Sequence, residues 1–225
     1  MTQYIIGDIH EEIKKLDKNS IDLIYTNPPY GTTNKQWDIP LKWEELFPEM
    51  ERVLKPNGVI LLHCSIPFTY DLIRIKKPNY HYVWLKNNPT NFFQAKNQPL
   101  RQVEEILVYY KKKHTYNPQM IGTENITYNR SNPYDGNLYY GNQKPNKSNQ
   151  IGKYPTNFLG SFTRILQKKS PKSIDDKILQ RMILTYSNED DTVLDMTCCD
   201  KNLGDISVNL KRKYIGIDIS DEYLK

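Results

Sequence analysis

The chain has 225 residues, of which 38% are hydrophobic, and a formal net charge of +5. This length fits one domain, or one domain with an insertion, and the mild positive charge permits a nucleic-acid partner without identifying one. No apolar run reaches the roughly 18 residues of a membrane helix, and the N-terminus lacks a basic segment followed by an apolar one. Membrane and secreted classes are therefore excluded, and the protein is expected to be intracellular (cytoplasmic).

The three cysteines, Cys64, Cys198 and Cys199, indicate neither a disulfide framework nor a metal site. An odd count with one adjacent pair differs from the even, spaced sets of disulfide-rich proteins. Adjacent cysteines also lack the two-residue gap of a zinc knuckle, and no histidine lies close to them in sequence. We therefore expect no metal.

The N-terminal half alternates short apolar runs with segments of helical spacing, as expected for an α/β fold. The pattern predicts strands at 4–6, 21–25, 59–64, 80–85 and 104–110, helices at 9–19 and 41–54, and a turn at 55–58. Pro48 falls inside the second helix and is expected to interrupt it. This order of elements predicts a parallel or mixed sheet.

The second half begins with a different composition. Residues 114–160 are dense in Asn, Tyr, Gly, Lys and Pro and show little periodicity, which predicts a loop-rich surface insertion. Helical spacing returns at 174–186, and strands are predicted at 192–196 and 213–219 with a short helix between them. The α/β pattern therefore resumes after the insertion.

The sequence TNPPYG (26–31) follows the buried strand predicted at 21–25. Ligand sites of open α/β sheets lie at the carboxyl ends of strands, so this position suits chemistry. Pro28 and Pro29 supply no N–H and fix their own φ angles, and Pro28 keeps Asn27 out of the helical region. The result is a stiff, extended turn with free carbonyl oxygens and an exposed amide.

Such a turn can bind an –NH2 group, because the Asn27 side-chain oxygen and the Pro28 carbonyl each accept one amine hydrogen. The nitrogen lone pair, otherwise delocalised into a ring, becomes localised and nucleophilic. Tyr30 offers a ring face to a flat base, worth about 1–3 kcal/mol. A proline-rich turn without chemistry is the alternative that these four residues alone leave open.

Several motifs together resemble the amino-methyltransferases that modify DNA, in the permuted (β-class) order. The stretch GDIHEEIKKLDKNSIDLIYTNPPYGTTNKQWD (7–38) resembles the opening of that family, LKPNG (54–58) its turn before a strand, and residues 87–112 a block that forms its pocket wall. Enzymes that methylate a glutamine of release factors resemble the chain less, because their cofactor loop precedes the Asn-Pro-Pro-Tyr turn. The resemblance covers essentially the whole chain.

The resemblance implies a Rossmann-like methyltransferase fold, in which helices cover both faces of a mostly parallel sheet, and S-adenosylmethionine as the methyl donor. It implies that residues 1–113 form the catalytic half of the domain and residues 161–225 the cofactor half. Residues 114–160 then form a target-recognition insertion. Its Asn side chains are expected to read bases, since Asn can pair bidentately with adenine.

The family's cofactor loop reads roughly Asp-Pro-Phe-x-Gly-Ser-Gly-x-x-Gly after a strand, and the segment TVLDMTCCDKNLG only partly matches it. Asp195 and Gly204 match, whereas Thr197 replaces the aromatic residue and Cys199 and Lys201 replace the first two glycines. A β-carbon at such a close-approach position is expected to crowd the cofactor or to force the loop outward.

Three further cofactor positions come from the resemblance. Before the strand, SPKSID (170–175) keeps only the proline of the family's His-Pro-Thr-Gln-Lys-Pro, with Ile174 at the lysine and Lys172 as a partial substitute. Asp218 ends the last predicted strand, where the resemblance implies an acid on the ribose hydroxyls. Asp8 stands where the family contacts the cofactor's adenine. Ordinary strand-end acids are the alternative for both.

The target base must leave the stack of double-stranded DNA to reach a pocket at Asn27. Phe92 and Phe93 fall in the block that resembles the pocket wall, where at least one packs beside the flipped base unless both belong to the core. Basic residues expected near DNA phosphates are Lys86, Lys96, Arg101 and Lys111–Lys113.

Two functions are consistent with this pattern. The first is a site-specific DNA methyltransferase acting on N6 of adenine, since the cytosine enzymes of the family more often have Ser at the position of Asn27. The second is a catalytically impaired relative that serves as a DNA-binding or partner subunit. Retention of the 27–30 turn favours the first, whereas Cys199, Lys201 and Ile174 favour the second. Either function allows a homodimer or an active partner subunit.

Overall fold

The structure is a computed structural model that describes residues 1–129, 147–160, 174–222 and 224. The chain forms two compact bodies, one of residues 1–117 and 157–225 and one of residues 118–156. The family residues expected at Pro171 and Lys172 lie outside the described ranges.

The first body is built on an eight-stranded sheet with the strand order β1-β10-β9-β2-β3-β5-β4-β8. Five neighbouring strands, from β1 to β3, run parallel, whereas β5 is antiparallel to both β3 and β4. The strands are β1 (Thr2–Ile6), β2 (Ile21–Thr26), β3 (Leu54–Cys64), β4 (Tyr80–Thr90), β5 (Arg101–Tyr109), β8 (Phe158–Leu159), β9 (Thr192–Asp195) and β10 (Lys213–Asp218).

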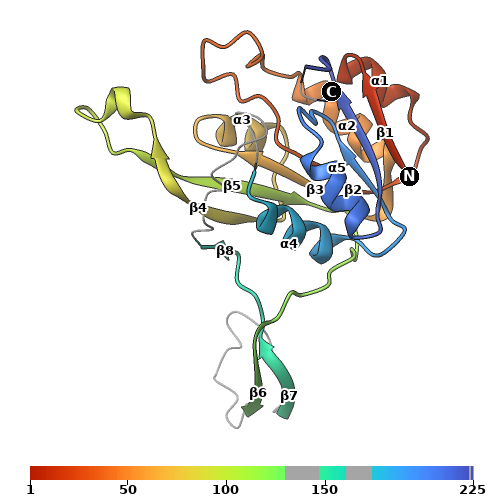
Figure 1. The fold of residues 1–225 in the computed structure, drawn as a ribbon, viewed down its shortest axis with the longest axis vertical. Helices are drawn as coiled ribbons and strands as arrows, with labels where there is room; N and C mark the ends of the chain where they lie inside the picture. The colour runs from red at the N-terminus through yellow and green to blue at the C-terminus, as the bar shows by residue number, and fades with distance from the viewer. Residues whose placement is uncertain (130–146, 161–173, 223, 225) are drawn as a thin grey trace. The chain divides into compact units, whose positions relative to one another are not determined.

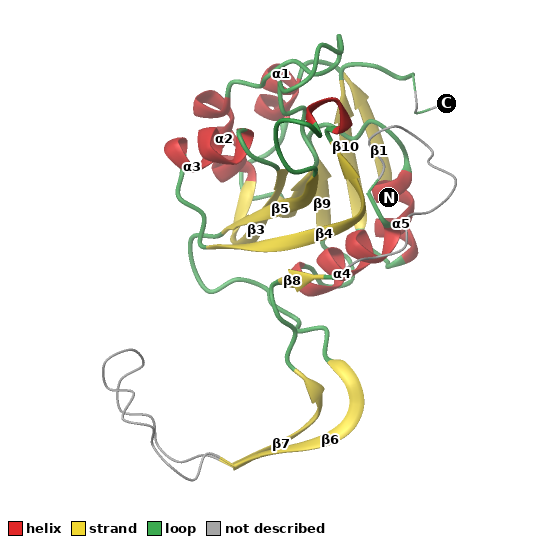
Figure 2. Cartoon of the chain, turned by 90° about the vertical axis from the view of Figure 1, so that its left-hand side faces the viewer, coloured by secondary structure: helices red, strands yellow, loops and turns green. Residues whose placement is uncertain are grey.

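Helices cover both faces of this sheet, and each face has its own apolar core (Figures 1 and 2). The helices are α1 (Ile9–Lys15), α2 (Trp43–Val53), α3 (Phe68–Ile75), α4 (Asp176–Tyr186) and α5 (Asn202–Asn209), with a 3-10 turn η1 (Phe92–Gln94). The buried residues of α1, α2 and α3 belong to one core, and those of α4 and α5 belong to the other. The predicted α/β architecture is confirmed.

The order of strands reflects the permuted order of motifs. The last two strands, β9 and β10, lie between β1 and β2, so that the ends of the chain meet in one sheet. Tyr4 of β1 is the register partner of Gly216 of β10, and Leu23 of β2 pairs with Val193 of β9. The segment that resembles a cofactor loop is thereby brought beside the Asn-Pro-Pro-Tyr turn.

The boundary between β2 and β9 is a topological switch point. From β2 the chain crosses through α2, over one face, to β3, whereas from β9 it crosses through α5, over the other face, to β10 on the opposite side. The two connections diverge, which opens a crevice at the carboxyl ends of β2 and β9. Ligands of open α/β sheets bind at such a crevice.

Two local predictions were wrong. Pro48 does not interrupt α2, because it lies on the exposed face, where the carbonyl it leaves without an N–H partner is open to water. Residues 55–58 do not form a separate turn but belong to β3, where the register with β2 shifts between Leu54 and Val59. Apolar burial on the other face of α2, through Leu46 and Met50, outweighs the proline.

The described part of the second body is a two-stranded antiparallel sheet of β6 (Ile121–Asn129) and β7 (Lys147–Lys153). The low periodicity of the sequence predicted loops here, and that prediction was wrong for these strands. Ile121 and Ile151 are exposed and Ile126 is half-buried, so the described side chains do not show the alternation of buried apolar and exposed polar residues that marks a half-buried strand.

Candidate active site

The Asn-Pro-Pro-Tyr turn leaves β2 at the switch point, as predicted. Pro28 and Pro29 are buried, whereas Asn27 and Tyr30 are half-buried. The Tyr30 ring stacks on Phe68 of α3, with 5.2 Å between ring centres and 20° between planes. One face of Tyr30 is therefore covered by the protein, and Tyr30 itself does not line the pocket described below.

Tyr30 also orients Asn27. The Tyr30 hydroxyl donates a hydrogen bond of 3.0 Å to the Asn27 side-chain oxygen. Burial, with a further contribution from the Glu104 carboxylate, raises the pKa of Tyr30 well above its ordinary value, so the hydroxyl remains a donor at neutral pH. An amide oxygen has two lone pairs, so it can accept an amine hydrogen in addition. This positioning role was not predicted from the sequence.

The loop after the turn is organised by Asp38. Its buried carboxylate accepts four hydrogen bonds of 2.7–2.9 Å, from the backbone N–H groups of Gly31, Thr32 and Thr33 and from the Thr33 hydroxyl. Burial alone raises the pKa of Asp38, but these hydrogen bonds outweigh it and lower the pKa. Gly31 has φ +65° and faces Pro40, where a side chain would clash. These hydrogen bonds to Asp38 thus fix the conformation of residues 31–38, which follow Tyr30 in the chain.

The loop after β9 is joined to the catalytic turn by a pair of threonines. The hydroxyls of Thr26, at the end of β2, and Thr197 lie 2.8 Å apart. The Thr197 N–H donates to the Asp195 carboxylate at 3.2 Å. Thr197 stands where the resemblance expects an aromatic ring, which has no hydroxyl to pair with that of Thr26.

Asp195 is the most perturbed carboxylate of this loop, with an exposed fraction of 5%. Burial raises its pKa to about 7, and the nearby carboxylates of Asp218 and Asp200 contribute to the rise. Hydrogen bonds from Thr26 and the Thr197 N–H act in the opposite direction. A carboxyl group with such a pKa at a crevice is typical of a functional site, and a cationic ligand would favour its charged form.

Cys199 adopts the backbone conformation for which a glycine is ordinarily used. Its φ is +48°, in the left-handed region, and its N–H donates to the Asp218 carboxylate at 2.9 Å. The Cys198 N–H donates to the Ile217 carbonyl, also at 2.9 Å. The loop is therefore held against β10 at both cysteines, and whether their β-carbons crowd the cofactor stays a prediction. Lys201 has φ −80° and is the N-cap of α5, so its backbone needs no glycine.

Two predicted cofactor residues have structural roles. Gly204 packs against Tyr4 and Tyr214, and a β-carbon there would lie 2.9 Å from the Tyr214 ring. Asp8 is exposed and caps α1 by accepting from the His10 N–H at 2.9 Å. Packing and capping thus explain Gly204 and Asp8 without a cofactor, and cofactor contact at either stays a prediction.

A third predicted cofactor residue, Asp218, accepts hydrogen bonds from the Cys199 N–H and from the Ser220 N–H.

One pocket combines both loops. It is lined by Tyr25, Thr26, Asn27, Ile174, Leu179, Asp195, Thr197, Cys198, Cys199, Asp200, Asn202 and Leu203. A cationic cofactor with ribose hydroxyls fits this donor set, because Asp195 and Asp200 supply carboxylate groups to the pocket. Asp218 does not line the pocket, but its carboxylate accepts from the N–H of Cys199, which does. Ile174 contributes an apolar wall where the resemblance expects a lysine.

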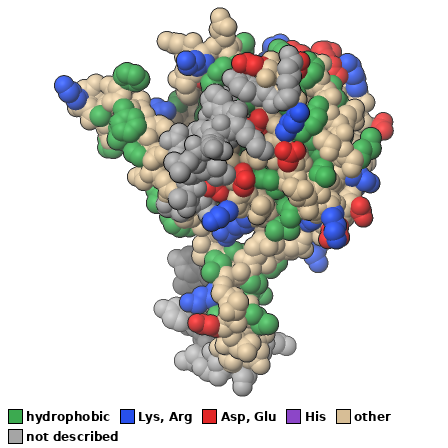
Figure 3. Space-filling view, viewed as in Figure 1, with side chains coloured by type: hydrophobic (Ala, Val, Ile, Leu, Met, Phe, Trp, Pro, Cys, Tyr) green, Lys and Arg blue, Asp and Glu red, His purple; other side chains and the backbone are tan. Residues whose placement is uncertain are grey.

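Four of the predicted DNA-contact residues, Phe92, Phe93, Lys96 and Arg101, lie between the end of β4 and the start of β5, on a hairpin that projects from the sheet (Figure 1). Phe92, with an exposed fraction of 64%, and Phe93, which is fully exposed, sit in η1 at its tip. The alternative that both belong to the core is wrong, and neither lines the pocket above. Lys96 and Arg101 are also exposed. Figure 3 shows apolar and basic side chains gathered on this hairpin.

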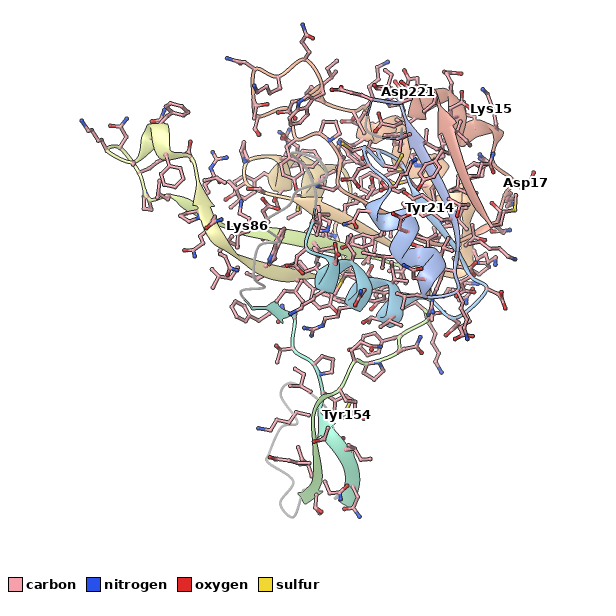
Figure 4. The ribbon with its side chains drawn as sticks, in the orientation of Figure 1. Lys15, Asp17, Lys86, Tyr154, Tyr214 and Asp221 are labelled. Atoms are coloured by element: carbon pink, nitrogen blue, oxygen red, sulfur yellow. The ribbon has the colours of Figure 1, made fainter. Side chains whose placement is uncertain are left out.

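Two of the other basic candidates are paired with acids. Lys86, on β4 (Figure 4), donates to Glu104 at 2.7 Å, and both side chains are largely buried. Lys111 lies 2.9 Å from Glu51. These lysines stabilise the sheet and helix α2 rather than extending freely toward a phosphate.

Within the described ranges, no group of three or more His, Cys, Asp or Glu side chains is arranged to hold a metal ion. Of the helices that the structure describes, none has the length and apolar character needed to cross a membrane.

The fold is that of the class of DNA methyltransferases. The crystal structure of the M1.HpyAVI–SAM complex superposes with a TM-score of 0.64 at 22% identity, covering 99% of this chain and 95% of that chain. The PvuII cytosine-N4-specific DNA methyltransferase superposes with a TM-score of 0.66 at 15% identity, covering 99% and 83%.

The sequence comparison identifies the family. Residues 21–225 match the family model described as DNA methylase, N6_N4_Mtase, and the chain belongs to this family. The type II methyltransferase M.HpaI of Haemophilus parainfluenzae is 30% identical, over 98% of this chain and 71% of that protein. The DNA adenine methyltransferase YhdJ of Escherichia coli (strain K12) is also 30% identical, over 98% and 79%.

Proposed function

We propose that this protein transfers a methyl group from S-adenosylmethionine to the exocyclic N6 amine of an adenine flipped out of double-stranded DNA. The observation that carries the proposal is the single pocket lined by both the Asn27 turn and the Asp195 loop. A methyl donor and an amine acceptor must meet within a few ångströms for transfer, and a shared pocket is the arrangement that permits it.

The chemistry at the acceptor follows from the catalytic turn. The Asn27 side-chain oxygen and the Pro28 carbonyl each accept one hydrogen of the amine, which localises the nitrogen lone pair. S-adenosylmethionine supplies an electrophilic methyl group on a sulfonium ion. Formation of the N–C bond would break the S–CH3 bond and release neutral S-adenosylhomocysteine, the same two oxygens would stabilise the hydrogens of the cationic amine, and one proton would then leave to solvent. Tyr30 keeps the Asn27 oxygen oriented.

Recognition of the cofactor is proposed for the residues after β9 and β10. Asp195, held by the hydrogen bonds of Thr26 and Thr197, provides a negative charge for the cationic end of the cofactor. Asp218 provides carboxylate oxygens for the ribose hydroxyls, as acids do at the same place in dinucleotide folds. Residues 161–225 are therefore proposed as the cofactor half and residues 1–113 as the catalytic half.

The exposed tip of the β4–β5 hairpin supports a DNA-facing role. Phe92 and Phe93 present apolar rings to solvent beside the basic Lys96 and Arg101. Aromatic rings stack on bases or wedge between them, and basic side chains bind phosphates. We assign this tip to the DNA around the flipped base rather than to the wall of the base pocket. Residues 114–160 are proposed as the target-recognition insertion.

Adenine is favoured over cytosine by two observations. Asn27 heads the catalytic turn, where the resemblance expects Ser more often in cytosine enzymes. YhdJ, at 30% identity over nearly the whole chain, is named a DNA adenine methyltransferase. The likeness to the cytosine-N4-specific PvuII enzyme, at 15% identity, concerns the fold alone.

The decisive experiment combines cofactor titration with methyl transfer. Purified protein is titrated with S-adenosylmethionine by calorimetry, then incubated with mixed-sequence duplex DNA, and the nucleosides are analysed for N6-methyladenine and N4-methylcytosine. N6-methyladenine, abolished in Asn27→Ala, is the expected result. Measurable cofactor heat without methylation, or no heat at millimolar cofactor, would favour the impaired relative that serves as a DNA-binding or partner subunit.

A further inference from the structure

The two-stranded ribbon of β6 and β7 has two chemically different faces. Residues directly opposite one another in an antiparallel pair share a face, and successive residues alternate. Asn125 pairs with Ile151 and Thr127 with Asn149, which places these four side chains on one face. Ile126 pairs with Gln150 on the other face. We call the first set the amide face.

The amide face is solvent-exposed and internally ordered. Asn125, Thr127 and Asn149 are exposed, and Ile151 has an exposed fraction of 64%. The Thr127 hydroxyl donates to the Asn149 side-chain oxygen at 3.0 Å, which orients that amide. On the opposite face the Gln150 amide donates to the Gly152 carbonyl of its own strand at 2.9 Å. The exposed amides of Asn125 and Asn149 and the exposed Ile151 side chain therefore lie on the same face of the ribbon.

Two glycines bend the ribbon. The register shifts between the Ile121–Lys153 pair and the Asn125–Ile151 pair, and the intervening Gly122 and Gly152 have φ +86° and +74°. A β-carbon on Gly152 would lie 2.8 Å from the Ile121 carbonyl oxygen, so the strands approach closely only because this residue is glycine. Figure 2 shows β6 and β7 as a curved pair. A curved two-stranded ribbon has the dimensions that the major groove of B-DNA admits.

The composition of the second body suits a nucleic acid. Residues 118–156 contain ten Asn and Gln but only two acidic residues, against four basic ones. Base edges are read by amides and small apolar groups, and phosphates attract basic side chains. A slightly basic, amide-rich surface therefore matches DNA.

We propose that the amide face reads A·T base pairs in the major groove, with Asn125 on the N6 and N7 of an adenine and Ile151 on the methyl group of a thymine. Asn is the side chain whose carboxamide matches the donor and acceptor pattern of adenine, and apolar side chains contact the thymine methyl. Their pairing across the ribbon sets the two contacts side by side. This inference rests on the proposed action on DNA and adds the chemistry of site selection.

The test separates binding from methylation. The full-length protein selects ligands from a pool of random duplex DNA, and the bound molecules are sequenced for wild type, Asn125→Ala, Ile151→Ala and Gln150→Ala. The wild type is expected to select a motif with at least one A·T pair that becomes degenerate in Asn125→Ala. Gln150→Ala, which removes an amide from the opposite face, is expected to leave the motif unchanged. Thermal unfolding checks that all four proteins fold alike.

Base analogues identify the atoms. Replacing the adenine with 7-deazaadenine, which lacks the N7 acceptor, is expected to weaken wild-type binding by about 5- to 150-fold and to have little effect on Asn125→Ala. Replacing the thymine with uracil, which lacks the methyl group, is expected to weaken wild type by a few-fold and Ile151→Ala not at all.

Each outcome decides one question. A motif that persists in Asn125→Ala and Ile151→Ala, a motif lost equally in Gln150→Ala, or no selected motif overturns the proposal. A selected motif that relaxes as expected but is never methylated leaves this inference standing and removes the proposed catalytic function instead.

Discussion

The two loops that meet at the pocket hold their shape by different means. After β2, the conformation of the turn is set locally, by two prolines and by the four hydrogen bonds to Asp38. After β9, it is set by a neighbouring strand, through the bonds from Cys198 and Cys199 to β10. The first loop therefore needs its sequence motif, whereas the second tolerates replacement of its glycines as long as β10 supports the backbone.

The largest expected effect tests the first loop. Asn27→Ala removes an acceptor made for the reacting amine, so kcat is expected to fall by about 10²- to 10³-fold, while the affinity for S-adenosylmethionine changes little. Asn27→Asp keeps an acceptor in the same place and is expected to retain most of the rate. Single-turnover methylation and calorimetry measure the two quantities. A cofactor affinity that falls in step with kcat would show that the turn mainly builds the cofactor site.

A second prediction concerns the support of that loop. Asp38→Ala leaves three backbone N–H groups without their acceptor, which is expected to lower the free energy of unfolding by about 2–4 kcal/mol. It is expected to slow methylation by about 10- to 100-fold through misplacement of Tyr30 and Asn27. Thr33→Val removes only one of the four hydrogen bonds, and we expect a cost of about 1 kcal/mol. Stability that falls without loss of rate would separate this loop from catalysis.

The second loop is expected to respond to pH. The pKa of Asp195 is about 7 in the folded protein. Only the charged form attracts a cationic cofactor, so the affinity is expected to rise by up to about tenfold between about pH 6 and 8. Calorimetry across this range measures the change. Asp195→Asn is expected to bind more weakly and with no such slope, and an equal slope in that variant would assign the effect to another group.

In the absence of cofactor, Asp195 lowers the free energy of unfolding as pH rises, whereas the same rise in pH increases the affinity for the cofactor. The folded pKa of Asp195 lies above that of an unfolded aspartate, so the folded state binds the extra proton between about pH 4 and 7. Its contribution to the free energy of unfolding is complete below that window and is lost as pH rises through about 7. Denaturant titrations of wild type and Asp195→Asn should converge at low pH and separate as pH rises.

The smallest expected effect concerns the replaced glycines. Cys199→Gly relieves a left-handed residue, a gain of about 1 kcal/mol that is partly offset by the greater freedom of glycine in the unfolded chain. Lys201→Gly, at an ordinary φ, has only the second effect and is expected to destabilise. An equal gain of cofactor affinity in both variants would show that the β-carbons of Cys199 and Lys201, rather than backbone strain at Cys199, limit cofactor binding.

Much of the fold was accessible from the sequence because its central strands are continuous apolar runs. Ile21–Thr26 and Thr192–Asp195 were placed within a residue or two, whereas their pairing in the sheet was not predicted. Pro48 and the Lys55–Gly58 segment were misread, because their outcome depends on which face is exposed and on a neighbouring strand. Secondary-structure propensity indicates neither which face of a helix is exposed nor which strand lies beside a segment.

Part of the candidate site was also accessible. The Asn27 turn was predicted from its position and residue types, and Asp195 from the resemblance to the family's cofactor loop. The hydrogen bonds between Tyr30 and Asn27 and between Thr26 and Thr197 were not predicted, since each depends on side chains brought together by the fold. The exposed position of Phe92 and Phe93 was missed because an aromatic pair beside a strand reads equally as core, pocket wall or surface.

The pairing of β1 with β10 has a consequence for synthesis. Thr2 and Tyr214 are register partners although they lie more than 200 positions apart. Contacts of such sequence separation form slowly, and here they cannot form before the last strand has left the ribosome. The Asn27 turn can therefore be made early, whereas β10, which lies between β1 and β9, can take its place only after residues 213–218 have been synthesised. A chain that stops before residue 213 would carry the Asn27 turn but would lack Asp218 and the strand that supports the loop after β9.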